Sequence, residues 1–357
     1  MPRPDDAGRF NPSEIAVLVV NGTEFYDWLS IEVKIEIAAY ASFSFTCTEF
    51  SPIPSAWTSL KFKPGDKCDV YLGGVHVLKG YILTRQVAYD GKTHAVQLSG
   101  VSLSFDIASS SIVTQAGNYD GYDWKRVTES LIKPFGVPLK VEGNISSLPF
   151  KNLQIQPGEL VWSCIERLAT QRKIRLGSTG MGEVLAIGDH QAGSGDGLVE
   201  GENILRARCI ISDVLAAQKY IGQGQDTGND EKWGDDVSKQ RTSVSGSLQR
   251  FKQIIVSSET PDSDEGLKLR VQMEHNHSEG TKVEAQIVVQ GWFSPSGKIW
   301  NVRQYPFVRS PMLMVEEPLG VRAVTFRQSV SEGTTTTLDV ISPIWMNGGP
   351  NYSLGAP

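Results

Sequence analysis

Residues 65–100, GDKCDVYLGGVHVLKGYILTRQVAYDGKTHAVQLSG, carry the clearest structural pattern in the chain. Gly73-Gly74 and Asp90-Gly91 are two-residue connectors of the kind that tight hairpin turns need, because both central positions must accept φ > 0. Apolar and polar residues alternate between these connectors, as they do in a half-buried strand. The stretch therefore predicts a meander of short antiparallel strands.

A turn at Asp90-Gly91 would set the register of the two strands beside it. The expected pairs on the apolar face are Leu83 with Leu98, Arg85 with Val96 and Val87 with His94. The other face is small, polar and uncharged, and carries Thr84, Gln86, Ala88, Thr93, Ala95 and Gln97. This pattern predicts one sheet face on a core and the other toward water. Arg85 has two interpretations: its head reaches past the sheet edge, or it forms a buried pair at a subunit contact.

A similar pattern recurs near the C-terminus, with apolar segments at 312–315 and 321–326, a turn at Glu332-Gly333 and a strand at 334–340. Gly80 precedes the first turn, and Gly320 precedes the second turn by a similar number of residues. We interpret this as a repeat of pattern that indicates a duplicated barrel. Alternating runs at 31–37 and 43–47 add strands to the first copy, so residues 14–108 predict a closed or nearly closed antiparallel barrel.

The apolar period changes between the two copies. Trp124, Val127 and Leu131 follow helical spacing, and a stronger helical pattern spans 160–169. The predicted fold class is mainly β with an α+β insert. It comprises two similar antiparallel β-barrel domains at residues 1–108 and 201–342, a small α/β domain at residues 109–200 and a tail at residues 343–357. The second barrel contains a polar loop at 222–246 and a helix at 263–279.

Composition narrows the functional classes. The 357 residues carry a formal net charge of -6, which argues against a protein that holds nucleic acid by neutralising phosphates but leaves room for passing contact. No signal-peptide pattern or long apolar run occurs, so we expect a soluble chain that is made in the cytoplasm and does not insert into membranes. The four cysteines lack metal-ligand spacing and predict reduced, mostly buried thiols.

The candidate phosphate-binding, metal-binding and catalytic motifs do not have the residue spacing that these functions require. Residues 291–298 resemble a phosphate loop, but five residues separate the glycines instead of four. The His-Asn-His triplet at 275–277 predicts a solvated helix face, since three adjacent residues cannot all face one metal. Glu159 and Glu166 are expected to be exposed carboxylates on one helix. The sequence thus predicts no catalytic residue, no cofactor and no metal.

Six motifs, in order along most of the chain, resemble those of the baseplate hub proteins of contractile-tailed bacteriophages, in particular Mu-like phages. More distantly they resemble the late-control-D and VgrG hub modules. They are GTEFYDW at 22–28, PG at 64–65 with LGG at 72–74 and KGYI at 79–82, GE at 158–159 with RLA at 167–169, GENIL at 201–205, GW at 291–292 with GKIW at 297–300, and the strands from Val315. Residues 301–306 and 222–246 depart from the family pattern.

The resemblance implies a structural virion protein of the tail baseplate. Its expected form is a homotrimer whose two barrels per chain make a pseudo-sixfold ring that joins the tail tube protein to the trimeric central spike protein and encloses the DNA channel. Baseplate wedge proteins are further implied partners. On this basis Thr84, Gln86 and Gln97 are expected to face the channel. The apolar Trp345 and Tyr352, in a Gly/Pro-rich tail, are expected to contact a partner.

Other functions remain open at this point. The same module could serve a tailocin or a type VI secretion puncturing device, because the mechanics are shared. A tail-associated cell-wall hydrolase would require a carboxylate or Cys/His site in residues 109–200. A carbohydrate-binding β-protein would be a monomer with an aromatic-lined cleft.

Overall fold

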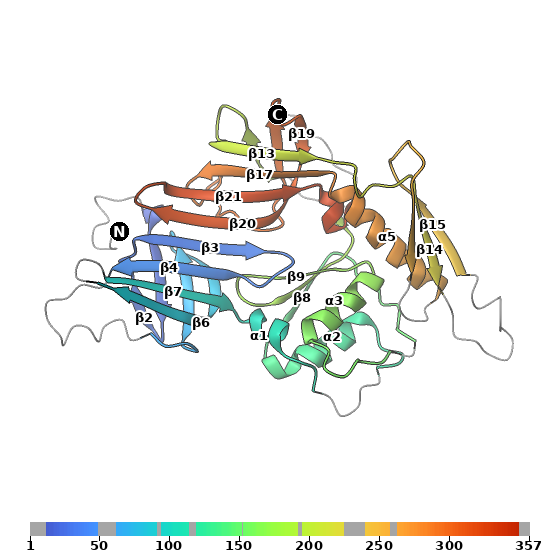
Figure 1. Cartoon of the computed structure of the whole chain (residues 1–357), viewed down its shortest axis with the longest axis horizontal. Coiled ribbons are helices and arrows are strands. Elements are labelled where there is room, and N and C mark those ends of the chain that lie inside the picture. The colour runs from blue at the N-terminus through green and yellow to red at the C-terminus, as the bar shows by residue number, and fades with distance from the viewer. Residues whose placement is uncertain are drawn as a thin grey trace.

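The structure is a computed structural model that describes residues 12–48, 62–90, 94–113, 119–151, 153–191, 195–224, 240–257 and 263–349. Its centre is a run of eight strands in which every neighbour is antiparallel (Figure 1). In spatial order these are β13 (Arg206–Ile211), β17 (Val283–Gln290), β21 (Gly333–Ile341), β20 (Gly320–Ser329), β3 (Ser30–Glu36), β4 (Ser42–Thr48), β7 (His94–Ser102) and β6 (Val75–Tyr89). The sheet continues from β6 into β5 (Lys67–Leu72), β1 (Ala16–Val20) and β2 (Thr23–Phe25).

The eight strands form a tandem repeat. The first half has the spatial order β6-β7-β4-β3, and the second half has β20-β21-β17-β13. Along the chain, the last two strands of each set of four make a hairpin, β6-β7 in the first half and β20-β21 in the second, so β6 corresponds to β20 and β7 to β21. Corresponding strands are four places apart in an antiparallel run and therefore point the same way. The repeat predicted between residues 65–100 and 312–340 is thus present in the hairpins β6-β7 and β20-β21, whereas residues 312–315 are not part of this sheet.

Two separate closed barrels are not confirmed. β3 pairs along residues 30–36 with residues 323–329 of β20, so the two halves share one ladder where each was expected to close on itself. Side chains from both halves, such as Phe45 and Phe326, also belong to one apolar core. The described strands form one open sheet because β3 of the first half pairs with β20 of the second half. The coarser prediction, a mainly β fold with an α+β insert, is confirmed.

The register predicted around Asp90-Gly91 is wrong by two residues. The observed pairs are Arg85 with Leu98, Val87 with Val96 and Tyr89 with His94. The strands are joined across residues 90–93, of which 91–93 lie outside the described part of the chain. A shift of two preserves which side chains share a face. Val87 is nevertheless 44% exposed and Leu83 40%, because this end of β6 extends past the core.

The insert has its own apolar core. It contains the helices α1 (Ser104–Ser109), α2 (Trp124–Ile132) and α3 (Val161–Gln171), packed with a small sheet of β8 (Leu139–Glu142), β10 (Val184–Ile187) and β9 (Arg175–Ser178). Trp124 is fully buried, and its indole Nε1 donates a hydrogen bond to the Ile165 carbonyl at 3.0 Å. The helical spacing of Trp124, Val127 and Leu131 reflects this packing.

A second insertion separates β13 from β17. It comprises β14 (Lys219–Gly224), β15 (Gln240–Ser245), β16 (Gln253–Ser257) and α5 (Asp264–Gly280). The helix expected at 263–279 is α5, and the Ser263 hydroxyl accepts a bond from the Gly266 N–H at its start. The loop expected at 222–246 is corrected, since β14 and β15 pair across its ends. Residues 225–239 between them lie outside the described part.

Short elements complete the chain. A three-stranded sheet contains β12 (Gly195–Val199), β18 (Pro306–Ser310) and β19 (Val315–Pro318), and β11 (His190–Gln191) pairs with β22 (Gly348–Gly349). The 3-10 helices of the described residues include η2 (Pro12–Glu14), η4 (Lys133–Phe135) and η5 (Pro343–Met346). Among the helices of the described ranges, none has the length and apolar character needed to cross a membrane.

The cysteines are free thiols, as predicted. Cys47, Cys68 and Cys164 are buried, and Cys209 is half-buried. Burial raises the pKa of Cys68 and of Cys164 to about 12, so both stay protonated near neutral pH. These thiols therefore act as small apolar side chains.

Candidate functional site

One face of the eight-stranded run carries two neighbouring cross-strand rows of polar side chains. One row is Thr84, Ser99, Ser44, Glu32, Arg327, Thr335 and Gln290, and the next begins Gln86, Gln97, Thr46, Ser30 and Ser329. The helices lie beside this run and leave the face uncovered (Figure 1). We call it the polar face.

The three residues expected to face the channel all lie on the polar face. Gln86 and Gln97 are directly opposite each other, and Thr84 is in the adjacent row. All three side chains are exposed. The Gln97 amide also donates to the Ser44 hydroxyl at 3.0 Å. The structure therefore brings these residues together on one continuous surface.

Two ion pairs lie on the polar face. The Arg327 Nε donates to Glu32 Oε2 at 2.9 Å, and Lys34 Nζ lies 2.5 Å from Glu36 Oε2. Sequence reasoning missed the first pair because its members are far apart along the chain, although alternation at 31–37 had indicated the exposed side of β3. A face with both signs interspersed has no strong single-sign field and would bind a polyanion weakly.

Trp345 lies inside the chain. It is 5% exposed, and the Arg175 guanidinium carbon is 4.0 Å from the centre of its ring. The Arg175 Nε donates to the Trp345 carbonyl at 3.1 Å. Asn347 extends this junction by donating from Nδ2 to the carbonyls of Lys173 and Ile187. The indole thus packs within its own chain, while Tyr352 lies outside the described residues and its partner contact stays a prediction.

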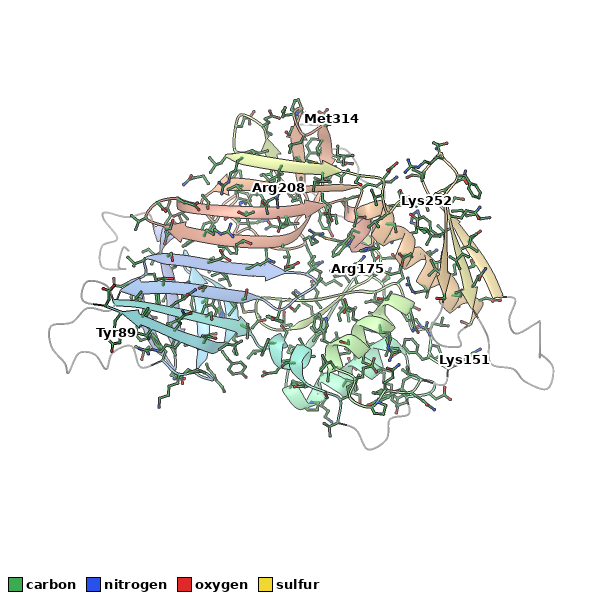
Figure 2. The ribbon with its side chains drawn as sticks, viewed as in Figure 1. Tyr89, Lys151, Arg175, Arg208, Lys252 and Met314 are labelled. Carbon is green, nitrogen blue, oxygen red and sulfur yellow. The ribbon has the colours of Figure 1, made fainter. Side chains whose placement is uncertain are left out.

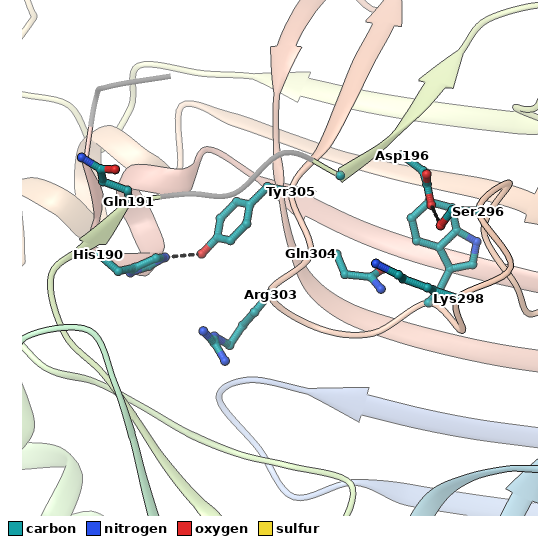
Figure 3. A pocket seen from close by; sticks show the side chains of 10 residues that line it. His190, Gln191, Asp196, Ser296, Lys298, Arg303, Gln304 and Tyr305 are labelled. Atoms are coloured by element: carbon teal, nitrogen blue, oxygen red, sulfur yellow. Dashed lines mark hydrogen bonds between the residues drawn. The ribbon is translucent and has the colours of Figure 1, made fainter. Parts of the chain in front are cut away.

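A polar pocket of about 570 Å³ lies where β11, β12 and the segment before β18 meet (Figure 3). Its walls include His190, Asp196, Ser296, Arg303 and Tyr305. His190 Nε2 and the Tyr305 hydroxyl are 2.5 Å apart, and burial raises the pKa of Tyr305 to about 12. The Ser296 hydroxyl donates to Asp196 instead of to the imidazole. This arrangement does not match a serine nucleophile activated by histidine.

The other candidates for chemistry are structural. Glu159 precedes α3, its side chain is only 10% exposed, and it pairs with Arg167 at 2.9 Å. Glu166 lies on α3 and is exposed, as expected. The expectation of two exposed carboxylates on one helix is therefore wrong for Glu159 only. Among the residues that the structure describes, no group of three or more His, Cys, Asp or Glu could hold a metal.

The His-Asn-His triplet lies on α5 and is half-buried, so its interpretation as a solvated face is also wrong. Burial is the main cause that lowers the pKa of His277, with the nearby Arg175 charge adding to it. Sequence periodicity could not indicate this, because the neighbouring groups come from β9, β14 and the C-terminal segment.

Two domain models match successive parts of the chain. Residues 15–102 match "Mu phage baseplate assembly protein GpP-like, N-terminal", and residues 104–188 match "Baseplate hub protein gp44-like, second domain". Between them they cover the first half of the eight-stranded run and the α/β insert.

Whole-chain comparisons point the same way. The 43 kDa tail protein of prophage MuSo2 from Shewanella oneidensis has a TM-score of 0.79 at 24% identity, covering 93% of this chain and 99% of that one. The E. coli c3393 protein, a type VI secretion component described as similar to T4 tail proteins gp27 and gp5, has a TM-score of 0.56 at 10% identity, covering 95% and 80%. The fold is thus that of a phage tail protein.

One relative identifies the kind of tail protein more specifically. The baseplate hub protein gp44 of Escherichia phage Mu is 22% identical over 296 residues, which are 81% of this chain and 77% of that protein. The resemblance to baseplate hub proteins of Mu-like phages, indicated by six sequence motifs, is confirmed.

Proposed function

We propose that this chain is a structural, non-catalytic hub of a contractile-tail baseplate. In this role it forms a homotrimeric ring in the virion, which connects the tail tube to the central spike and surrounds the DNA channel. Residues 1–108 and 201–342 provide the two equivalent units of each chain. The similarity to hub and tail proteins supports the class, and the tandem repeat supports the ring.

The tandem repeat is the observation that carries the proposal. Two four-stranded units with the same strand order and direction are related by displacement along the sheet. Three such chains would present six similar units while keeping threefold symmetry for a trimeric spike. A sixfold tube on one side and a threefold spike on the other need an adaptor of this kind.

Mass in solution tests the ring. We expect the purified chain, or its complex with the spike, to contain three copies of 39.1 kDa each, measured by light scattering. Electron microscopy of that particle should show six similar sheet units around a central hole. A monomer under all conditions, together with absence of the chain from purified baseplates, would refute the proposal.

The polar face is proposed to line the channel. Replacing Thr84, Gln86 and Gln97 together by Arg would add three positive charges per chain to this wall, and clustered cations hold DNA phosphates. In phage particles carrying this hub, we expect DNA delivery to fall by at least about tenfold while particle numbers stay normal. The uncharged triple variant T84S/Q86N/Q97N is the matched control. Equal delivery by both variants would place these residues away from the DNA path.

A hub of a type VI secretion or tailocin device is the second candidate, and the fold similarity to the c3393 protein favours it over other classes. Neighbouring genes distinguish the two, since a phage hub needs capsid and DNA-packaging genes. A cell-wall hydrolase is tested by turbidity loss of a cell-wall suspension, and we expect none.

A further inference from the structure

The hairpin of β18 and β19 ends in an exposed apolar turn. Residues 311–314, with the sequence Pro-Met-Leu-Met, join the two strands, and we call them the methionine tip. Met312 is 83% exposed and Met314 is 82% exposed. Figure 2 shows Met314 at the outer end of this hairpin, at the periphery of the molecule. Exposed apolar side chains that gather at one place are typical of a surface that binds a partner.

Hydrogen bonds fix the backbone of the methionine tip. Glu200, directly after β12, accepts from the Ser310 hydroxyl at 2.6 Å and from the Met312 N–H at 3.1 Å. The Ser310 oxygen in turn accepts from the Leu313 N–H at 3.3 Å. These bonds to Glu200, with that from Ser310 the main cause, lower the pKa of its carboxyl, which is therefore charged at neutral pH.

The same turn keeps the two methionines in water. Leu313, between them, packs against the main apolar core. Met314 has a φ of 58°, in the left-handed region that residues other than glycine rarely adopt. Its N–H donates to the Pro311 carbonyl at 3.1 Å. Because the turn is already ordered in the single chain, binding through the two thioethers would cost little backbone entropy.

The surroundings of the methionine tip are acidic. Residues 200–202 and 309–317 contain four glutamates, one arginine and no lysine. The Nε of Arg309, the one arginine, lies 3.3 Å from Glu316 Oε1, so this guanidinium already has a carboxylate beside it. A surface of this kind attracts a basic surface and repels an acidic one.

We propose that the methionine tip inserts into an apolar pocket with a basic rim on another protein of the tail. This inference rests on the proposed function and adds a docking surface for a partner of defined chemistry. Methionine suits such a contact because its unbranched, polarisable side chain adapts to an irregular pocket. A second copy of this chain is the competing occupant, but two copies that met tip to tip would bring their acidic surroundings together.

Oxidation of the methionines tests whether the tip is covered. Dilute hydrogen peroxide converts exposed thioethers to sulfoxides, and mass spectrometry of the peptides measures each position. In the purified chain alone we expect Met312 and Met314 to react rapidly. In purified tails that contain the chain, both should react at least about tenfold more slowly. Met273 and Met346, which are 4% and 0% exposed, are internal controls and should react slowly in both samples.

The possible outcomes separate the inference from the proposed function. Reaction of Met312 and Met314 in tails at the rate of the purified chain would overturn the inference alone. Protection that is already complete in an oligomer of the purified chain would show that a second copy covers the tip, and would overturn it as well. Absence of the chain from purified tails would instead refute the proposed function, and the inference with it.

A double variant tests the apolar contact. Met312→Ser combined with Met314→Ser changes only exposed side chains, so we expect the far-ultraviolet circular dichroism of the native chain. Phage particles carrying this variant should be at least about tenfold less infectious. Val330→Ser is the matched control, because Val330 is 89% exposed in the turn between β20 and β21, and it should leave infectivity unchanged. Normal infectivity of the double variant would contradict the proposed contact.

A charge reversal tests the basic rim. Glu202→Lys combined with Glu316→Lys replaces two exposed carboxylates near the tip by ammonium groups. We expect infectivity to fall at least about tenfold, because like charges would then face each other across the contact. Glu332→Lys, in the turn between β20 and β21, is the control and should have no effect. Full infectivity of the reversed variant would show that the rim of the partner is not basic and would overturn the inference.

Discussion

Gly80→Ala is expected to destroy the first half of the fold. Gly80 belongs to β6 at the point where this strand leaves β5 and joins β7, and it pairs with both Cys68 and Ser102. A Cβ at this position would lie 1.7 Å from the Val101 carbonyl oxygen. Backbone cannot move away as a flexible side chain can, so the strands would have to separate. We expect the free energy of unfolding to fall by about 4 kcal/mol or more.

The measurement is urea unfolding followed by circular dichroism, together with the soluble yield of the protein. Gly197→Ala is the matched control, because Gly197 is also in a strand and its added Cβ would approach nothing closer than 3.9 Å. It should change the free energy of unfolding by less than about 0.5 kcal/mol. Equal stability of both variants would mean that β6 and β7 do not approach each other at Gly80 as closely as the structure shows.

Trp345→Ala is expected to have the second largest effect. The indole fills the junction between the insert and α5, where Gly280 leaves room for it: a Cβ on Gly280 would lie 2.5 Å from the Cβ of Trp345. Its removal leaves a cavity and exposes one face of the Arg175 guanidinium. Loss of a buried tryptophan predicts a decrease of about 3–5 kcal/mol in the free energy of unfolding.

Two further variants control for this effect. Phe251→Ala removes an aromatic side chain that is 81% exposed and should be nearly neutral. Trp345→Phe keeps a ring beside Arg175 and should lose less stability than Trp345→Ala. If Trp345→Ala keeps native stability but loses spike binding, the residue contacts a partner and its packing within the chain contributes little. Truncation after Ser342 cannot separate these roles, because it also removes Asn347 and its bonds to the insert.

Much of the candidate surface could be predicted from local patterns. Alternation between Thr84, Gln86 and their neighbours placed these side chains on one exposed face, and a register error of two residues did not change that. The pairing of Glu32 with Arg327 had no sequence signal, since it depends on β3 and β20 lying side by side. Trp345 shows a different problem: an apolar residue in a Gly/Pro-rich tail gives the same sequence pattern whether it contacts its own chain or a partner.

Periodicity and turn residues by themselves determined the β-rich class, the helical insert, the helix that became α5 and the repeat between the two hairpins, because these features depend on side chains a few residues apart. Only the tertiary structure decided that β3 and β20 join the halves into one sheet, which begins at β13 and continues beyond β6 into β5, β1 and β2. The pairing of β3 with β20 joins residues hundreds of positions apart, and the alternation within a strand specifies which face is buried but not which strand lies beside it.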